Sequence, residues 1–370
     1  MSAVPADRDT VLRQAVELGA SDLIISAGYP VMMQRWGALE PLPGSAVLSA
    51  LDSRRLAESF LNPALHERFT RDLELDTRHF IPGIGHFRVN LFIQRGHWGA
   101  VVRVIPLHIP LPSDIGLPSH TVQKLLGFAR GLILVTGPTG AGKSTTIASL
   151  LEQLNQTGPA RHIITIEDPI EFLFEPKQAV FEQREVGVDT KTYARGLRGA
   201  LRQMPHVIFV GEMRDLTSMS MALSAAETGN LVISTMATQS AAQTVTRIID
   251  SFPPHQQPQI RAQLALTLRA VVSQLLLPRM DGKGRVAARE IMFATQAVQN
   301  LVRDDKVHQI PNVIATSLRE DMVSMDDALA ELVDRSLVDF EVTYPHYSDP
   351  EKRASVQKRF YRTASVKGHS

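Results

Sequence analysis

Residues 132–145 decide the fold of this chain: they read Leu-Ile-Leu-Val-Thr-Gly-Pro-Thr-Gly-Ala-Gly-Lys-Ser-Thr. The apolar run at 132–135 suits a strand that is buried on both faces, and residues 146–151 suit a helix. Between them lies a glycine-rich loop of the form G-x-x-x-x-G-K-S. A strand, such a loop and a helix in this order predict a phosphate-binding site rather than a turn with a chance Gly-Lys-Ser.

Each residue type in the loop has a physical role in binding phosphate. Glycines let successive backbone N–H groups turn toward an anion, and the helix N-terminus adds the positive end of its dipole. Lys143 is expected to reach the β- and γ-phosphates, and the Ser144 hydroxyl is expected to hold Mg²⁺. The chain should therefore bind a nucleoside triphosphate through the following residues: Gly137, Pro138, Thr139, Gly140, Ala141, Gly142, Lys143, Ser144 and Thr145.

Acidic residues follow two further apolar runs, at 162–167 and 207–211. Glu167 and Asp168 close the first run, and Glu212 follows the second. Ligands bind at the carboxyl edge of parallel sheets, so these acids are expected beside the phosphate loop. Glu167 would then hold Mg²⁺ together with Ser144, and a second carboxylate would polarise the attacking water. The alternative is that each acid caps a helix, but their joint position beside the loop favours hydrolysis.

Composition excludes several other classes of protein. The 370 residues are 44% hydrophobic and 21% charged, which is typical of a globular chain with two or three domains. A net charge of +1 indicates no global attraction to nucleic acid or membranes. The chain has no cysteine, which rules out disulfides and a cysteine-based zinc site. We find no signal peptide and no apolar run long enough to cross a bilayer.

The order of the predicted elements indicates an α/β protein with two domains. Residues 1–106 should mix helices with a largely antiparallel sheet, whose strand at 86–92 alternates apolar and polar residues. Prolines mark a stiff linker at 107–118. From 119 to 340 strands and helices alternate as in a parallel sheet, with 256–276 and 296–338 mostly helical. Residues 341–370 are rich in lysine and arginine, and we expect a flexible tail rather than a dedicated binding arm.

These segments, in this order, resemble the type IV pilus retraction (twitching motility) ATPases, the PilT/PilU family of the secretion-type (GspE-like) ATPase superfamily. The resemblance runs from residue 10 to residue 338. Besides the phosphate loop it rests on these stretches: Gly19-Ala20-Ser21-Asp22-Leu23, Phe87-Arg88-Val89-Asn90, Glu167-Asp168-Pro169-Ile170-Glu171, Gln183-Arg184-Glu185-Val186, Gly211-Glu212-Met213-Arg214-Asp215 and Ala297-Val298-Gln299-Asn300-Leu301-Val302-Arg303-Asp304.

The resemblance implies a fold, a chemistry and a set of partners. It implies a PAS-like N-terminal domain, a RecA-like P-loop ATPase domain, ATP with Mg²⁺, and Glu212 as catalytic base. Arg88 and Arg103, with Arg95 behind them, would supply the family's arginine fingers to a neighbouring subunit. Hexameric rings of such subunits would pass nucleotide-driven domain movements to an inner-membrane pilus platform protein, from the cytoplasmic side. The family's assembly and export branch carries a four-cysteine zinc module, so a chain without cysteine favours the retraction branch.

Four positions depart from the family pattern. Asn230 and Ala237 stand where the His box has histidines, His206 replaces an acid, and Gln299 replaces an arginine of the retraction motif. An amide or a methyl group cannot relay a proton as imidazole does, so turnover is expected to be slow or lost. Two alternatives to a main motor therefore stay open: an accessory subunit that assists an active homologous retraction ATPase, and an export or DNA-uptake ATPase.

Overall fold

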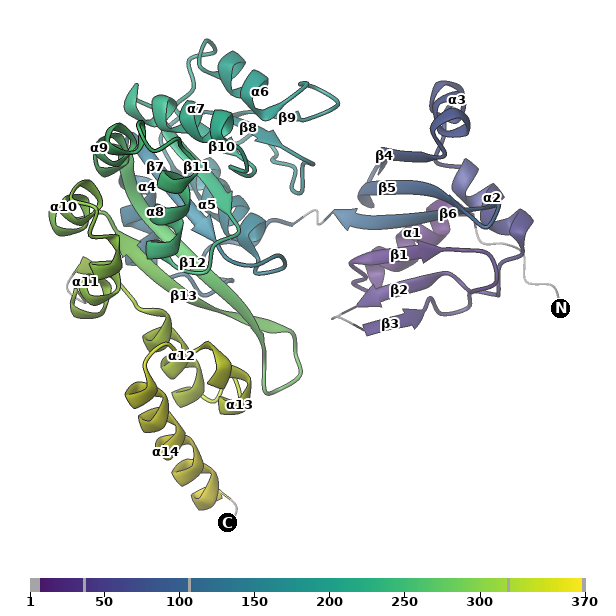
Figure 1. Cartoon of the computed structure of the whole chain (residues 1–370). Helices are drawn as coiled ribbons and strands as arrows, with labels where there is room; N and C mark the ends of the chain where they lie inside the picture. The colour runs from purple at the N-terminus through teal and green to yellow at the C-terminus, as the bar shows by residue number, and fades with distance from the viewer. Residues whose placement is uncertain (1–6, 36–37, 106–107, 318–319, 368–370) are drawn as a thin grey trace. The chain divides into compact units, whose positions relative to one another are not determined.

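The computed structural model describes residues 7–35, 38–105, 108–317 and 320–367. The chain divides into two compact units between His108 and Ile109, which lies inside the predicted linker. Leu107, the first residue of that predicted linker, lies outside the described residues. Figure 1 follows the chain through the N-terminal unit and then the C-terminal unit.

The N-terminal unit is built on an antiparallel sheet, in the order β3-β2-β1-β6-β5-β4 for the residues described. Its elements are α1 (Arg8–Glu17), β1 (Asp22–Ile25), β2 (Met32–Arg35), β3 (Ala38–Pro41), α2 (Ala50–Glu58), α3 (Pro63–Asp72), β4 (Glu74–Ile81), β5 (Gly85–Gln94) and β6 (His97–Ile105). Helix α3 begins after Asn62, the N-cap residue, whose side chain accepts a hydrogen bond from the Leu65 amide at 2.9 Å.

One face of this sheet forms the core of the unit. Phe87, Val89 and Leu91 on β5 are fully buried, which confirms the predicted alternation, and they cluster with Leu12 of α1 and Phe69 of α3. Side chains on successive strand residues point to opposite faces, so Arg88 lies on the other face.

Arginines from three neighbouring strands line up on that second face. Arg88 of β5 lies opposite Arg103 of β6 on one side and opposite Arg78 of β4 on the other. Asp22 of β1 continues the row beyond Arg103. We call Arg78, Arg88 and Arg103 the arginine row.

The C-terminal unit is organised around a sheet in the order β13-β12-β7-β11-β10-β8-β9, in which only β13 runs antiparallel among the described strands. Its elements are α4 (Ser119–Gly127), β7 (Gly131–Thr136), α5 (Lys143–Thr157), β8 (His162–Glu167), β9 (Val180–Glu185), α6 (Tyr193–Ala200), β10 (Val207–Val210), α7 (Leu216–Glu227), β11 (Leu231–Met236), α8 (Ala241–Asp250), α9 (Gln257–Thr267), β12 (Leu268–Pro278), β13 (Arg285–Phe293), α10 (Gln296–Arg303), η1 (Val307–Gln309), α11 (Ile310–Thr316), α12 (Met325–Asp334), α13 (Phe340–Thr343), η3 (Tyr344–His346) and α14 (Pro350–Lys367).

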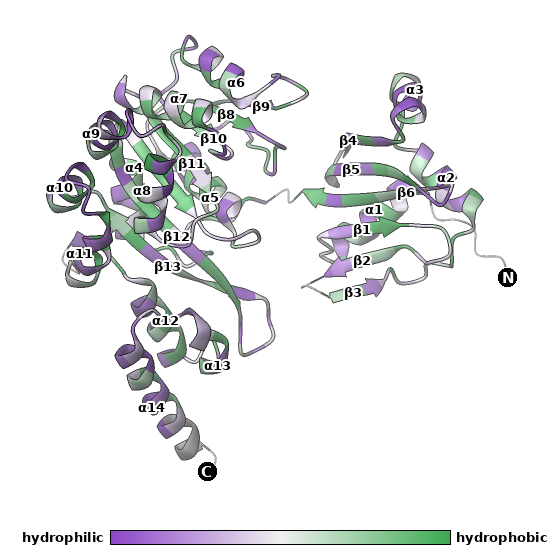
Figure 2. Cartoon of the chain, in the orientation of Figure 1, coloured by the Kyte–Doolittle hydropathy of each residue, from purple (hydrophilic) through white to green (hydrophobic). Residues whose placement is uncertain are grey.

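The central strands are buried on both faces. Every residue of β7, β10 and β11 is buried, and Figure 2 shows these strands as hydrophobic. Strands of this kind need helices on both sides, and they read as continuous apolar runs in the sequence. The strands expected at 132–135, 162–167 and 207–211 are therefore confirmed within a residue at their ends.

Residues 268–276 form a strand, so the prediction of a helix over 256–276 is wrong beyond Thr267. Helix α9 ends there, and Leu268 is already extended, with φ −61° and ψ 134°. The apolar run that follows lies between β7 and β13. Periodicity alone cannot separate a buried strand from a buried helix. A turn that includes residues 281–284 joins β12 to β13.

The basic C-terminal segment is helical and packed, so the prediction of a flexible tail is wrong for the residues described. Val356 of α14 is fully buried in a cluster with Leu329 and Phe340. Lys352 pairs with Asp327, and Arg359 pairs with Asp334 at 2.9 Å, so α12 neutralises two of the basic residues. A count of charges along the segment does not reveal these ion pairs, because each acidic partner lies 25 residues upstream of its basic residue.

Candidate nucleotide-binding site

The phosphate loop joins β7 to α5, as predicted. Gly137, Gly140 and Gly142 all have positive φ, at 143°, 80° and 82°, a region that favours glycine. At Gly137 a side chain would also collide with the chain, because a Cβ there would lie 2.3 Å from the carbonyl oxygen of Gln274. The loop is therefore shaped by backbone geometry that other residues could not adopt.

Lys143 begins α5 and folds back over the loop. Its Nζ donates to the carbonyl oxygens of Gly137 at 2.8 Å and Pro138 at 3.0 Å. Burial lowers the pKa of Lys143, and the nearby carboxylates of Glu212 and Glu171 oppose that shift. The ammonium group thus lies at the mouth of the loop, between the backbone that would hold phosphates and the predicted catalytic acid.

Gln274 of β12 holds the loop from behind, and the sequence analysis missed it. Its Nε2 donates to the Ala141 carbonyl at 2.5 Å, and its Oε1 accepts from the Thr146 hydroxyl at 2.9 Å. Next to it, the hydroxyls of Ser273 and Thr136 are 2.8 Å apart. The only local signal is a polar pair, Ser-Gln, inside an otherwise apolar run, and it does not indicate which segment Gln274 contacts.

Glu167 lies at the carboxyl end of β8 and is only 6% exposed. Burial raises the pKa of Glu167 to about 7, although hydrogen bonds from Thr165 at 2.6 Å and Gln183 at 3.5 Å favour its ionised form. A bound cation stabilises the ionised form of a buried carboxylate, because it replaces the hydrating water that burial removes. The structure therefore gives Glu167 the environment of a metal-facing acid.

Glu212 follows the end of β10 and stays partly accessible, with 26% of its side chain exposed. Its Oε2 lies 2.8 Å from Nη2 of Arg214. Strands β8 and β10 pair in parallel through Val210 and Ile166, which brings Glu212 and Glu167 to the same sheet edge as the phosphate loop.

Tyr193 is a further residue of this edge that the sequence analysis did not identify. A Cβ at Gly211 would lie 3.0 Å from the Tyr193 hydroxyl and 3.4 Å from the Glu167 Cα. Burial raises the pKa of Tyr193, as do the nearby acids Asp168, Glu212 and Glu167. Gly211 is therefore required for close packing between the two acid-bearing segments.

The residues present fit a Mg²⁺ ion that is shared with phosphates. Within the described part of the chain, no group of three or more His, Cys, Asp or Glu side chains is arranged to hold a metal. Mg²⁺ characteristically takes one or two protein oxygens and completes its shell with waters and substrate phosphates. The Ser144 hydroxyl and the buried Glu167 carboxyl are oxygens of that kind.

Arg88 and Arg103 belong to the N-terminal unit, not to the unit that carries the loop. Arg88 lies 3.8 Å from Asp76, and Arg103 lies 2.8 Å from Asp22. Arg95 occupies the turn between β5 and β6 with a positive φ of 49°.

Of the four positions that depart from the family pattern, Gln299 lies in α10, and the other three fall at opposite edges of the sheet. Ala237 follows β11 at the carboxyl edge, where the loop lies. Asn230 precedes β11 at the amino edge, and its Nδ2 donates to the Ala225 carbonyl at 3.1 Å. His206 precedes β10 at the same amino edge, where its Nδ1 accepts from the His162 amide at 3.0 Å. The structure thus keeps Asn230 and His206 away from the phosphate loop.

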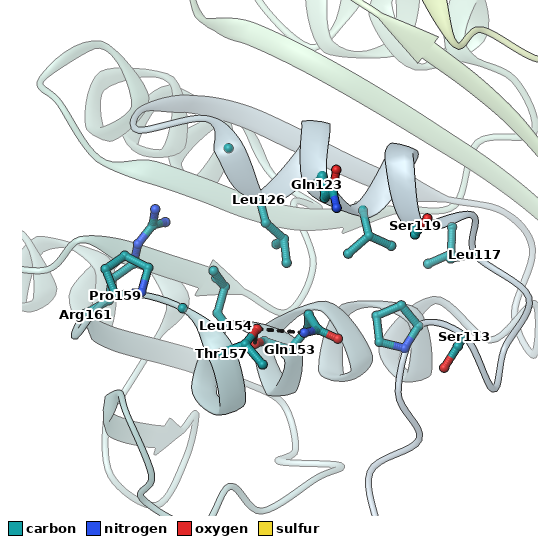
Figure 3. Close-up of a pocket in the computed structure, with 14 residues that line it drawn as sticks. Ser113, Leu117, Ser119, Gln123, Leu126, Gln153, Leu154, Thr157, Pro159 and Arg161 are labelled. Carbon is teal, nitrogen blue, oxygen red and sulfur yellow. Dashed lines mark hydrogen bonds between the residues drawn. The ribbon is translucent and has the colours of Figure 1, made fainter.

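Two of the cavities formed by the described residues of the C-terminal unit matter for the site, and the smaller of the two adjoins the loop. It measures about 470 Å³ and is bordered by Ala141, Gly142 and Thr145. The larger one, about 570 Å³, lies between α4 and the last turns of α5, where Leu126 and Leu154 face each other (Figure 3). It is at the far end of α5 from Lys143, so its size does not make it the phosphate site.

The phosphate loop with its neighbouring acids places the chain among the P-loop nucleoside triphosphatases. Comparison with known proteins narrows this class. The family described as "Type II/IV secretion system protein" matches residues 116–345, which is more than half of the chain. The chain belongs to this family of secretion and pilus ATPases.

Its relatives include pilus ATPases along nearly their whole length. The chain is 42% identical to the type IV pilus retraction ATPase PilT of Pseudomonas aeruginosa, over 90% of this chain and 96% of that one. It is 36% identical to the type IV pilus ATPase PilU of the same organism, over 91% and 88%. A crystal structure of the pilus retraction motor PilT with bound ADP matches with a TM-score of 0.84 and 42% identity, over 92% and 97%.

The match confirms the predicted fold class, since it extends through both units. Among the helices that the structure describes, none has the length and apolarity that a bilayer crossing requires.

Proposed function

We propose that this chain is an ATP-driven motor that retracts a type IV pilus, acting as a hexameric ring. One observation carries the proposal: the similarity to PilT spans both units. The position of the Lys143 ammonium at the loop, near the Glu212 carboxylate, supports it. The lower identity to PilU, 36% against 42%, favours a main motor over an accessory subunit.

In this proposal each site residue has a separate role. Backbone N–H groups of the loop and Lys143 bind the phosphates of ATP, while Ser144 and Glu167 hold Mg²⁺. Glu212 takes the proton of the attacking water, and its partial exposure leaves room for that water. Bound Mg²⁺ would supply charge stabilisation for the leaving phosphates.

Arg88 and Arg103 act as fingers on the ATP of a neighbouring subunit in the ring. Their support is chemical, because guanidinium groups stabilise charge that develops on transferred phosphoryl groups. An inner-membrane platform protein, reached from the cytoplasmic side, would receive the domain movements.

Restoration of pilus retraction tests this function directly. Expression of the full chain in a cell that lacks its own retraction ATPase should restore twitching motility, and the purified ring should release phosphate from ATP. Lys143→Ala should abolish both, because the phosphates lose their point charge, and its circular dichroism should match wild type. Rapid hydrolysis without restored motility would instead favour an export or DNA-uptake ATPase. Affinity for ATP that stays within about threefold in Lys143→Ala would contradict the site itself.

A further inference from the structure

The 470 Å³ cavity beside the phosphate loop is lined by an arginine, Arg289, whose Nε has no hydrogen-bond partner among the described residues. Arg289 of β13 lies directly opposite Gln274 of β12, the residue that holds the loop. Residues opposite each other on neighbouring strands project from the same face, so Arg289 lies on the loop side of the sheet. Both residues line the cavity, together with Gly142 and Thr145.

The Arg289 guanidinium is buried, and no acidic side chain among the described residues offsets the free energy of its desolvation. The residue is 8% exposed, and within the described residues its Nε has no hydrogen-bond partner. Burial alone lowers the pKa of Arg289 to about 10, with no acidic neighbour to oppose the shift. Buried charges and donors are normally paired, so an unpaired one beside a cavity indicates a ligand.

Among the other arginines that line this cavity, two have partners, and Arg285 is exposed to solvent. Arg279 forms a forked pair with Asp281, with its closest contact at 2.7 Å, and Arg335 pairs with Glu331 at 3.1 Å. Glu290, adjacent to Arg289 in sequence but on the other face, accepts from the Ala241 amide at 2.7 Å. The missing partner is thus a property of Arg289 and not of the surroundings in general.

The position of the cavity indicates which part of a nucleotide it would take. It borders the outer side of the loop at Gly142 and Thr145, whereas Lys143, Glu167 and Glu212 do not line it. The γ-phosphate belongs beside those three residues, so the cavity leads toward the opposite end of the nucleotide. Its volume of about 470 Å³ is within the usual range for small-molecule pockets and admits a nucleoside.

We propose that Arg289 positions bound ATP by donating hydrogen bonds to its adenosine moiety. A guanidinium offers five donors in a fixed fork, and adenine nitrogens and ribose oxygens offer acceptors for them. The proposal rests on the proposed nucleotide function and adds a residue that fixes the end of ATP remote from the reaction.

Comparison of ATP with inorganic tripolyphosphate tests this role, because tripolyphosphate keeps the phosphates and lacks the nucleoside. Dissociation constants for both, with Mg²⁺, are measured by calorimetry on the full chain. Arg289→Met should weaken ATP binding about tenfold or more and leave tripolyphosphate within about threefold. Equal weakening of both ligands would mean a phosphate contact, and no change in either would mean a structural role; each result overturns the proposal.

Two further variants serve as controls for the Arg289→Met measurement. Arg261→Met removes an arginine that is paired with Asp305 and does not line this cavity, so it should leave both affinities unchanged. Arg289→Lys keeps the charge and loses the fork, so it should weaken ATP selectively and serves if Arg289→Met fails to fold. Replacement of an unpaired buried charge by an apolar side chain of similar size should not lower the melting temperature without ligand. If wild type bound neither ligand, the nucleotide function itself would fail, which is a separate outcome.

Discussion

At the scale of single residues, the two ends of β11 have different consequences for catalysis. The sequence pattern groups Asn230 with Ala237 as one altered motif. The structure separates them by the whole strand, roughly 20 Å at the usual rise per residue. Asn230 caps the end of α7 through the Ala225 carbonyl. His206 lies at that same amino edge and cannot replace a histidine beside the phosphates.

We therefore expect Ala237→His alone to raise ATP turnover, by about tenfold or more, because an imidazole at the carboxyl edge can position a group in the transition state. Asn230→His should leave turnover near wild type. Steady-state phosphate release at saturating ATP measures both. A wild type that already hydrolyses ATP rapidly, or a gain that requires Asn230→His, would show that catalysis does not need a histidine at the carboxyl edge of the sheet.

At the scale of elements, β12 shows what the sequence could and could not predict. The phosphate loop, the parallel strands and the two acids follow from local patterns, since glycine spacing and buried apolar runs carry that information. Gln274 could not be found in this way. Its role depends on β12 lying next to β7, a pairing between segments more than 130 residues apart. Long-range pairing of this kind leaves no local mark.

The same element supports a stability prediction. Gln274→Met should lower the free energy of unfolding by about 2–4 kcal/mol, because the buried Thr146 hydroxyl and the Ala141 carbonyl both lose their partner. It should also weaken ATP binding, since the loop loses its support. Denaturant unfolding and calorimetry give the two values. Ser273→Ala is the matched control on β12, and its loss should be about 1 kcal/mol. Equal losses in the two variants would mean that Gln274 is not the main support.

Helix α14 gives a second test at this scale. Val356→Ala should cost about 2 kcal/mol of unfolding free energy, because the side chain is fully buried against α12 and α13. Lys358→Ala, on an exposed part of the same helix, should change stability by less than about 0.5 kcal/mol. A flexible tail, as the charge pattern predicts, would make both changes equally silent in thermal unfolding.

At the scale of the whole molecule, the proposed ring can be tested by mixing two inactive variants. Lys143→Ala has no working loop but intact arginines, and Arg88→Ala has an intact loop. If Arg88 acts on a neighbouring subunit, some interfaces in a mixed ring combine an intact phosphate loop from one subunit with an intact Arg88 from the next. Phosphate release should then appear on mixing and exceed the sum of the two variants alone. Arg54→Ala, an exposed arginine paired with Glu58, should behave as wild type. If rings of confirmed mixed composition release no more phosphate than the two variants alone, the arginine does not act in trans.

The arginine row also has a cost that the N-terminal unit bears when no anion is present. Like charges that face each other on adjacent strands repel, and Arg78, Arg88 and Arg103 lie in direct register. Dissolved salt screens such repulsion, because the Debye length falls to about 3 Å at 1 M. If this repulsion outweighs the ion pairs of Arg88 with Asp76 and of Arg103 with Asp22, the unit is more stable at high ionic strength than at low, and the opposite result would show that the ion pairs dominate. Sulfate or phosphate, with two charges to bridge neighbouring guanidinium groups, should stabilise it at lower concentration than chloride.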